Sequence, residues 1–115
     1  MVGTLTYSIV PKAAATRASH QSWSIAPSGT EATMYAVRLA RAFTGRNTIL
    51  KMIGGWHGAN TDLMVDVFPP RYGVPEGRGL PPELTRCTRS CSYNDEQDTA
   101  RAMNEIGTDL AAVIL

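Results

Sequence analysis

Residues 28–58 read SGTEATMYAVRLARAFTGRNTILKMIGGWHG and carry the signals for a helix, a tight turn and a buried strand in direct succession. Ser28 and Glu31 have the spacing of a capping box, in which the serine oxygen accepts a hydrogen bond from the Glu31 amide and the glutamate reaches back. We therefore expect a helix that starts at Ser28, runs to about Thr44 and is ended by Gly45.

Apolar side chains recur along this expected helix at intervals of three and four residues. Such a stripe is typical of a helix that packs one side on a core. We predict that this stripe is buried and that Thr33, Arg38 and Arg41 lie on the other side. The predicted buried residues are Ala32, Tyr35, Ala36, Leu39, Ala40 and Phe43.

Two further segments have the composition of buried strands. Residues 48–53 (TILKMI) are short and mostly apolar and are followed by the glycine-rich stretch 54–58, and residues 110–115 (LAAVIL) are apolar throughout. A third strand is expected around residues 88–93 (TRSCSY). A second helix is expected between the last two segments. Alternation of helices with buried strands predicts an α/β layered fold with a mostly parallel sheet.

The second expected helix has its own start and stop signals. Asp95 is placed to cap it, and we expect the helix to run to about Ile106, with Ala100 and Met103 facing inward. Gly107 closes the helix, as glycine commonly does.

A long connection covers residues 59–82, which contain five of the seven prolines of the chain. Proline denies a sheet its backbone donors, so the segment is not regular throughout and must lie on a surface. We expect it to be the least ordered part of the chain after the leader and to act as a lid in a complete enzyme, because long loops are usually functional or disordered. The alternative is an inert connection packed down by Leu63, Val65, Val67 and Phe68.

Composition excludes several classes of protein. The 115 residues are 43% apolar with a formal charge of +1, and they contain neither a bilayer-length apolar stretch nor a block of like charge. Membrane and nucleic-acid functions are therefore disfavoured. Cys87 and Cys91 have no partners for a four-ligand metal site, so we expect no metal and two free thiols in a reducing compartment.

Residues 1–25 differ in composition from the rest of the chain. The first acidic residue is Glu31, whereas Lys12 and Arg17 fall in a lead rich in serine, threonine and alanine. We interpret residues 1–25 as a loosely ordered or foreign leader, with a targeting segment as the alternative. The folded unit then covers residues 26–115.

The start of the first helix suggests a binding site for phosphate. The amides of Gly29 and Thr30 and the hydroxyls of Ser28 and Thr30 converge on the positive end of the helix dipole, and Gly29 permits close approach to the backbone. The alternative is that Ser28, Gly29 and Thr30 are ordinary capping residues.

Trp56 and His57 suggest a second half of the same site. They follow a buried strand and are bracketed by glycines, where the tryptophan can stack on a flat ring. Alternatively, Trp56 is a core anchor and His57 a structural histidine. A phosphate site, a helix, a strand and an aromatic side chain at the strand end together describe a site for a phosphorylated aromatic cofactor.

These motifs resemble those of the class III pyridoxal-phosphate-dependent aminotransferases, and most closely those of the aminomutases in that class. The resemblance runs from about residue 26 to residue 115 and rests on SGTEATMYAVRLARAFTGR, GGWHG, YND and AAVI. Two positions depart from the family pattern, which usually has Asn at Pro27 and Tyr or Phe at Trp56. Trp56 keeps a stacking face, so the cofactor interpretation is not affected.

The resemblance implies a fold, a cofactor and roles for individual residues. Residues 26–115 would be a truncated part of the cofactor-binding large domain, a partial three-layer αβα unit of fold type I. Gly29 and Thr30 would bind the phosphate of pyridoxal 5'-phosphate with Ser28 as cap and near contact. Trp56 would stack on the pyridine ring, with His57 beside it.

The resemblance also implies that this chain is part of an enzyme that moves an amino group on a small amino-acid-like substrate. The complete protein would be a cytoplasmic homodimer. The lysine that binds the cofactor covalently in the family is expected beyond Leu115, and neither Lys12 nor Lys51 fits that role, so we expect the chain alone to be inactive. The alternatives are a non-catalytic truncated product and a phosphate- or cofactor-binding module.

Overall fold

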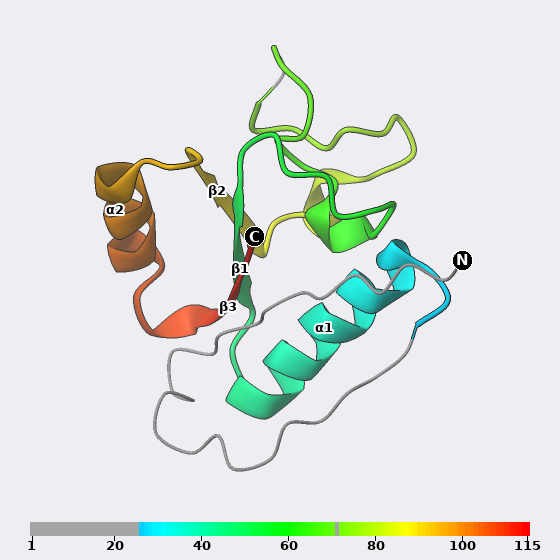
Figure 1. Ribbon diagram of the computed structural model, residues 1–115, viewed down its shortest axis with the longest axis horizontal. Coiled ribbons are helices and arrows are strands. Elements are labelled where there is room, and N and C mark those ends of the chain that lie inside the picture. Colours follow the sequence, from blue (N-terminus) through cyan, green and yellow to red (C-terminus); the bar gives the residue numbers. More distant parts are fainter. Residues whose placement is uncertain (1–25, 71) are drawn as a thin grey trace.

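The computed structural model describes residues 26–70 and 72–115, so the expectation for residues 1–25 lies outside the described residues. Two helices lie on opposite faces of a small sheet (Figure 1). The helices are α1 (Gly29–Thr44) and α2 (Glu96–Ile106), and the strands are β1 (Thr48–Met52), β2 (Thr88–Cys91) and β3 (Leu110–Ile114). Short 3-10 helices span Thr61–Leu63, Pro82–Leu84 and Gly107–Asp109.

The sheet is parallel, as the sequence predicted. Its order is β2-β1-β3, with Leu50 of β1 opposite Arg89 of β2 and Val113 of β3. Helix α1 covers one face of the sheet and helix α2 covers the other. Along the chain α1 precedes β1, and α2 lies between β2 and β3, which is the layered α/β arrangement. The central strand β1 is buried from Ile49 to Met52, as expected for a parallel strand covered on both faces.

Local capping chemistry sets the ends of both helices. The Ser28 side chain accepts a hydrogen bond from the Glu31 amide at 3.2 Å, and Gly45 ends α1 in the left-handed conformation. The Asp95 side chain accepts from the Asp98 amide at 2.9 Å, and Gly107 ends α2. These four boundaries confirm the prediction. Among the described residues, the reciprocal bond from Glu31 back to the Ser28 amide is not formed.

The predicted inner face of α1 is wrong except at Ala40, which is buried as expected. Tyr35, Leu39 and Phe43 are exposed, whereas the buried residues of this helix are Thr33, Val37 and Ala40. Val37 and Ala40 pack in a cluster with Ile49, Leu63, Ala111, Ala112 and Ile114. Small and β-branched side chains bring the helix close to the sheet, and the Thr33 hydroxyl finds a buried carbonyl there, so the larger side chains lie outside.

The other face of the sheet packs on α2. Leu50, Met52, Cys91 and Leu110 form its buried cluster, against which Ala102, Met103, Ile106 and Val113 pack. The prediction for Met103 is confirmed, whereas the prediction for Ala100 is wrong because this residue is exposed. Ala102 takes the inward position, because it lies four residues before Ile106 and residues three or four apart share a helix face.

Candidate functional site

The candidate site lies where the start of α1 meets the turn that follows β1. The Thr30 side-chain oxygen accepts a hydrogen bond from the Ala59 amide at 3.1 Å. The Thr33 hydroxyl donates to the His57 carbonyl at 2.8 Å. Two segments about thirty residues apart in sequence are therefore joined directly, and they meet at the carboxyl end of β1, where ligands bind in open α/β sheets.

Gly58 permits this close approach. Its φ of +77° lies in the left-handed region, and a Cβ atom added there would lie 2.3 Å from Thr30 Oγ1 and 2.7 Å from Thr30 Cα. No residue other than glycine fits between the two segments without moving the backbone of α1. The glycine after His57 was a turn signal in the sequence, but its contact with Thr30 could not be predicted.

The first turn of α1 presents donors to this junction. Ser28 Oγ is engaged by the Glu31 amide, and Ala32 donates to the Ser28 carbonyl at 3.0 Å. Within residues 26–70 and 72–115, the amides of Gly29 and Thr30 donate to no group. These two amides sit at the positive end of a 16-residue helix, which is the arrangement that binds phosphate in many proteins.

The turn after β1 places its two predicted site residues differently. Trp56 is 53% exposed, and its ring lies 6.0 Å from the ring of Phe68, at an interplanar angle of 35°. His57 is 4% exposed, and burial, followed by the nearby charge of Lys51, lowers the pKa of its imidazole. Trp56 therefore offers a ring face at the surface, while His57 is buried and its imidazole is neutral at neutral pH.

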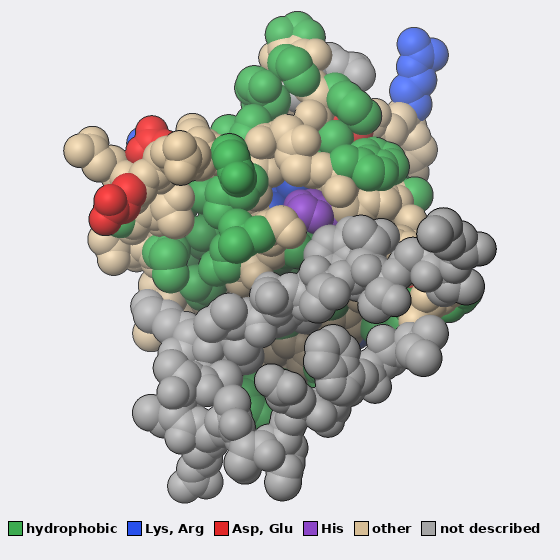
Figure 2. All heavy atoms as spheres, viewed as in Figure 1, with side chains coloured by type: hydrophobic (Ala, Val, Ile, Leu, Met, Phe, Trp, Pro, Cys, Tyr) green, Lys and Arg blue, Asp and Glu red, His purple; other side chains and the backbone are tan. Residues whose placement is uncertain are grey.

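Hydrophobic side chains gather on the upper part of the molecule, over the segments that connect β1 to β2 (Figure 2). In the segments that connect β1 to β2, the exposed large hydrophobic residues include Trp56, Phe68, Tyr72 and Val74. By contrast, Leu63, Val65 and Val67 are buried, as the alternative of a packed connection expected for these three side chains. Phe68 departs from that expectation, because it is exposed beside Trp56.

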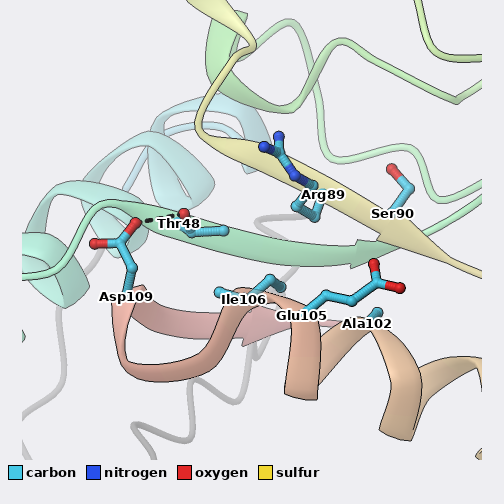
Figure 3. A pocket seen from close by; sticks show the side chains of 7 residues that line it. All are labelled: Thr48, Arg89, Ser90, Ala102, Glu105, Ile106 and Asp109. Atoms are coloured by element: carbon cyan, nitrogen blue, oxygen red, sulfur yellow. Dashed lines mark hydrogen bonds between the residues drawn. The ribbon is translucent and has the colours of Figure 1, made fainter.

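A pocket of about 230 Å³ lies elsewhere, between α2 and the sheet (Figure 3). Thr48 and Asp109 stand at the amino ends of β1 and β3, and the Thr48 hydroxyl donates to Asp109 at 2.6 Å. This bond lowers the pKa of the Asp109 carboxyl. Because this pocket lies at the strands' amino ends, away from the edge where ligands bind in open α/β sheets, it is a weaker candidate ligand site than the junction at Thr30. Its lining residues are Thr48, Arg89, Ser90, Ala102, Glu105, Ile106 and Asp109.

Neither cysteine forms part of a site. Cys91 is buried and Cys87 half-buried, and both are free thiols. The described part of the chain contains no group of three or more His, Cys, Asp or Glu side chains able to hold a metal ion. None of its helices is long and apolar enough to cross a membrane.

The chain is similar to curated proteins and to solved structures over about three quarters of its length. A glutamate-1-semialdehyde 2,1-aminomutase from Akkermansia muciniphila is 46% identical over 90 residues, which are 76% of this chain and 21% of that protein. No family model matches the chain. The chain therefore spans about a fifth of the length of this relative.

Two solved transaminases have the same fold in the matched region. An omega-transaminase from Sphaerobacter thermophilus has a TM-score of 0.66 and 34% identity, covering 75% of this chain and 22% of its own. A transaminase with PLP bound has a TM-score of 0.68 and 33% identity, covering 75% of this chain and 20% of its own. These findings confirm the family resemblance: over about three quarters of its length, the chain is a homologue of one segment of glutamate-1-semialdehyde 2,1-aminomutase and has the fold of the transaminases.

Proposed function

We propose that this chain supplies one half of a pyridoxal phosphate site in an aminomutase or aminotransferase. The observation that carries the proposal is the hydrogen bond between Thr30 and Ala59, which joins the start of α1 to the turn that carries Trp56. The similarity to an aminomutase and to a transaminase with PLP bound supports it. The reaction class is the movement of an amino group on a small amino-acid-like substrate, of the glutamate-1-semialdehyde type.

The residues present fit the phosphate of this cofactor. The amides of Gly29 and Thr30 would donate to its oxygens, and Gly29 adds no side chain that would block them. The Thr30 oxygen already accepts from Ala59, so its hydroxyl hydrogen is the group left to donate. Ser28 would act mainly through the cap, since its oxygen is engaged with Glu31.

The residues of the turn fit the ring. Trp56 presents a large aromatic surface at the molecular surface and would stack on the pyridine ring. His57 would lie beside that ring as a neutral group, because burial and the charge of Lys51 oppose its protonation. When bound, the cofactor supplies the electron-withdrawing ring that amino transfer requires.

The chain alone is proposed to be inactive. Of its two lysines, Lys51 is fully buried, with its ammonium group donating to the Val65 carbonyl at 2.7 Å, and cannot reach a ligand beside Trp56. The complete enzyme is proposed to be a cytoplasmic homodimer, as the family resemblance implies. The segment 59–82 is proposed to act as its lid, and equal hydrogen exchange with and without a substrate analogue would exclude that role.

The phosphate site is tested by replacing the Thr30 hydroxyl. Thr30→Val keeps the shape of the side chain and should weaken binding of pyridoxal phosphate by about tenfold or more, since a hydrogen bond to a charged group contributes about 1.5–3 kcal/mol. Titration of the 115-residue chain, followed by the fluorescence of Trp56 in a Trp23→Phe background, gives the dissociation constant. Thr44→Val, at the far end of α1, is the matched control and should leave it unchanged. Equal affinity of both variants would reject the site.

A further inference from the structure

Lys51 is a charged side chain in the middle of the buried central strand. It is 0% exposed, and its neighbours across the sheet are Ser90 of β2 and Ile114 of β3. Burying an ammonium group is costly unless hydrogen bonds and opposite charges compensate for the lost water. The groups around Lys51 should therefore include the hydrogen-bond acceptors and opposite charges that compensate for its burial.

Among the described residues, the hydrogen-bond acceptor and the carboxylates that compensate the Lys51 ammonium group come from one loop, residues 64–70 and 72–76, called the loop 64–76 below. Lys51 Nζ donates to the Val65 carbonyl at 2.7 Å. Burial lowers the pKa of Lys51, and the charges of Asp66 and Glu76 act against that shift. A single buried cation is thus balanced by a backbone carbonyl and two carboxylates of the same loop.

The two carboxylates also close this loop on itself. Glu76 Oε1 accepts from the amides of Val67 at 2.7 Å and Phe68 at 3.0 Å, and the Asp66 carboxylate accepts from the amide of Gly73. The backbone adds a bond from the Glu76 amide to the Met64 carbonyl at 2.9 Å. The hydrogen bonds within the loop therefore connect its two ends, and Lys51 contacts it through the Val65 carbonyl.

A second bond fastens the base of the loop to the end of β1. The Gly54 amide donates to the Asp66 carbonyl at 2.8 Å, next to the carbonyl that Lys51 holds. Two consecutive carbonyls of the loop are thus tied to β1 and its turn. This placement sets the Phe68 ring beside Trp56, at 6.0 Å between the ring centres.

We propose that Lys51 is a positioning residue, which fastens the base of the loop 64–76 to β1 and so places the loop against the turn that carries Trp56 and His57. The inference rests on the proposed function in one respect: the turn that carries Trp56 and His57 would form one wall of the pyridoxal phosphate site. It assigns Lys51 no contact with the cofactor, since the loop lies on its ammonium group.

Hydrogen exchange of the full chain, measured by NMR, tests the anchoring. In Lys51→Met, hydrogen exchange of the amides of Gly54, Val67 and Phe68 should become faster than in the native chain. This increase should be at least about tenfold larger than the increase for core amides such as that of Leu50, because the loop then opens while the core stays folded. The control is Ile49→Met, which changes a buried residue two positions earlier on the same face of β1. It should change the exchange rates of the loop amides and of the core amides by the same factor. If Lys51→Met also changed the two groups of amides by the same factor, the proposal would be overturned.

A second measurement reports on the charge of Lys51. Removing a buried cation near His57 should raise the pKa of this imidazole in Lys51→Met, measured by NMR titration in a His20→Gln background. Ile49→Met should leave that pKa unchanged, since it removes no charge. A His57 pKa that stays constant or falls in Lys51→Met would overturn the proposed placement.

A third measurement needs no variant, in case Lys51→Met does not fold. The chain has two lysines, Lys12 and Lys51, so acetylation of each can be followed by mass spectrometry. Lys51 should react at least about a hundredfold more slowly in the native chain than in urea, because opening must precede reaction. Equal rates would overturn the proposal. Failure of the native chain to bind pyridoxal phosphate would reject the proposed function alone, since none of these three readouts depends on the cofactor.

Discussion

The two helices begin with the same capping chemistry but have first turns of opposite character. Ser28 caps α1 by accepting from the Glu31 amide, and Asp95 caps α2 by accepting from the Asp98 amide. In a parallel α/β unit both starts lie at the end of the sheet where ligands bind. Capping alone therefore does not distinguish a binding site from a structural helix start.

Charge makes the distinction. The first turn of α2 carries Glu96 and Asp98 after its acidic cap, and Asp98 accepts from the Ser92 amide at 2.7 Å and pairs with Arg101. These bonds, that of the Ser92 amide first, lower the pKa of Asp98 to about 2. The first turn of α1 has one carboxylate, Glu31, behind two amides that donate to no described group. The helix dipole is already satisfied in α2, so we expect an anion to bind at the start of α1 rather than at the start of α2.

The largest effect is expected from breaking the junction that only α1 makes. Gly58→Ala should reduce the free energy of unfolding by about 3 kcal/mol, because the new methyl group meets the backbone of Thr30 and the residue keeps a left-handed φ. Urea unfolding measures the change. Gly73→Ala is the control: its φ of +79° is similar, but nothing lies within 4 Å of the added atom. We expect a loss of about 1 kcal/mol there. Similar losses in both variants would contradict the proposed contact.

An intermediate effect is expected from giving α1 the charge that α2 already has. Gly29→Glu adds a carboxylate to the first turn of α1, and should weaken binding of pyridoxal phosphate by about tenfold or more through repulsion. The same change should stabilise the helix by about 1 kcal/mol, because glycine is a poor helix former and the dipole favours an acid there. Gln97→Glu in the first turn of α2 is the control and should leave the affinity unchanged. Equal weakening by both variants would reject α1 as the anion site.

The smallest effect is expected from removing the charge that satisfies α2. The Asp98 pKa is lower in the folded chain than its ordinary value of 3.8, so its contribution to stability is present above about pH 4 and is lost as the pH falls through 2. Asp98→Asn should therefore lose less stability than the native chain between pH 5 and pH 2, in urea unfolding followed by circular dichroism. Glu105→Gln, near the other end of α2, is the control and should behave like the native chain. An Asp98→Asn profile that follows the native one would contradict the lowered pKa.

Helix ends and strands were predictable because their causes are local. The caps at Ser28 and Asp95 act across three residues, and the stops at Gly45 and Gly107 need only a positive φ. Strands β1 and β3 were predicted because a parallel strand covered on both faces is apolar along its length, whereas β2 (TRSC) lacks this pattern. The phosphate-type helix start and Trp56 were combined into one cofactor site from the sequence, the roles of the individual residues came from the family resemblance, and their binding role stays a prediction.

The sequence by itself thus determined where α1 begins and ends, but the tertiary structure decided which side of it is buried. Two stripes that share Ala40 satisfy the helical period: one adds Thr33 and Val37, the other adds Tyr35, Leu39 and Phe43, and hydrophobicity alone favoured the second. The fold selects the first because the Thr33 hydroxyl can reach the His57 carbonyl and the smaller side chains fit against β3. Likewise, a lysine in an apolar strand does not indicate its partner. Lys51 acquires its role only when a carbonyl 14 residues further along the chain is folded over it. Such contacts depend on loop closure and packing, which a local pattern does not contain.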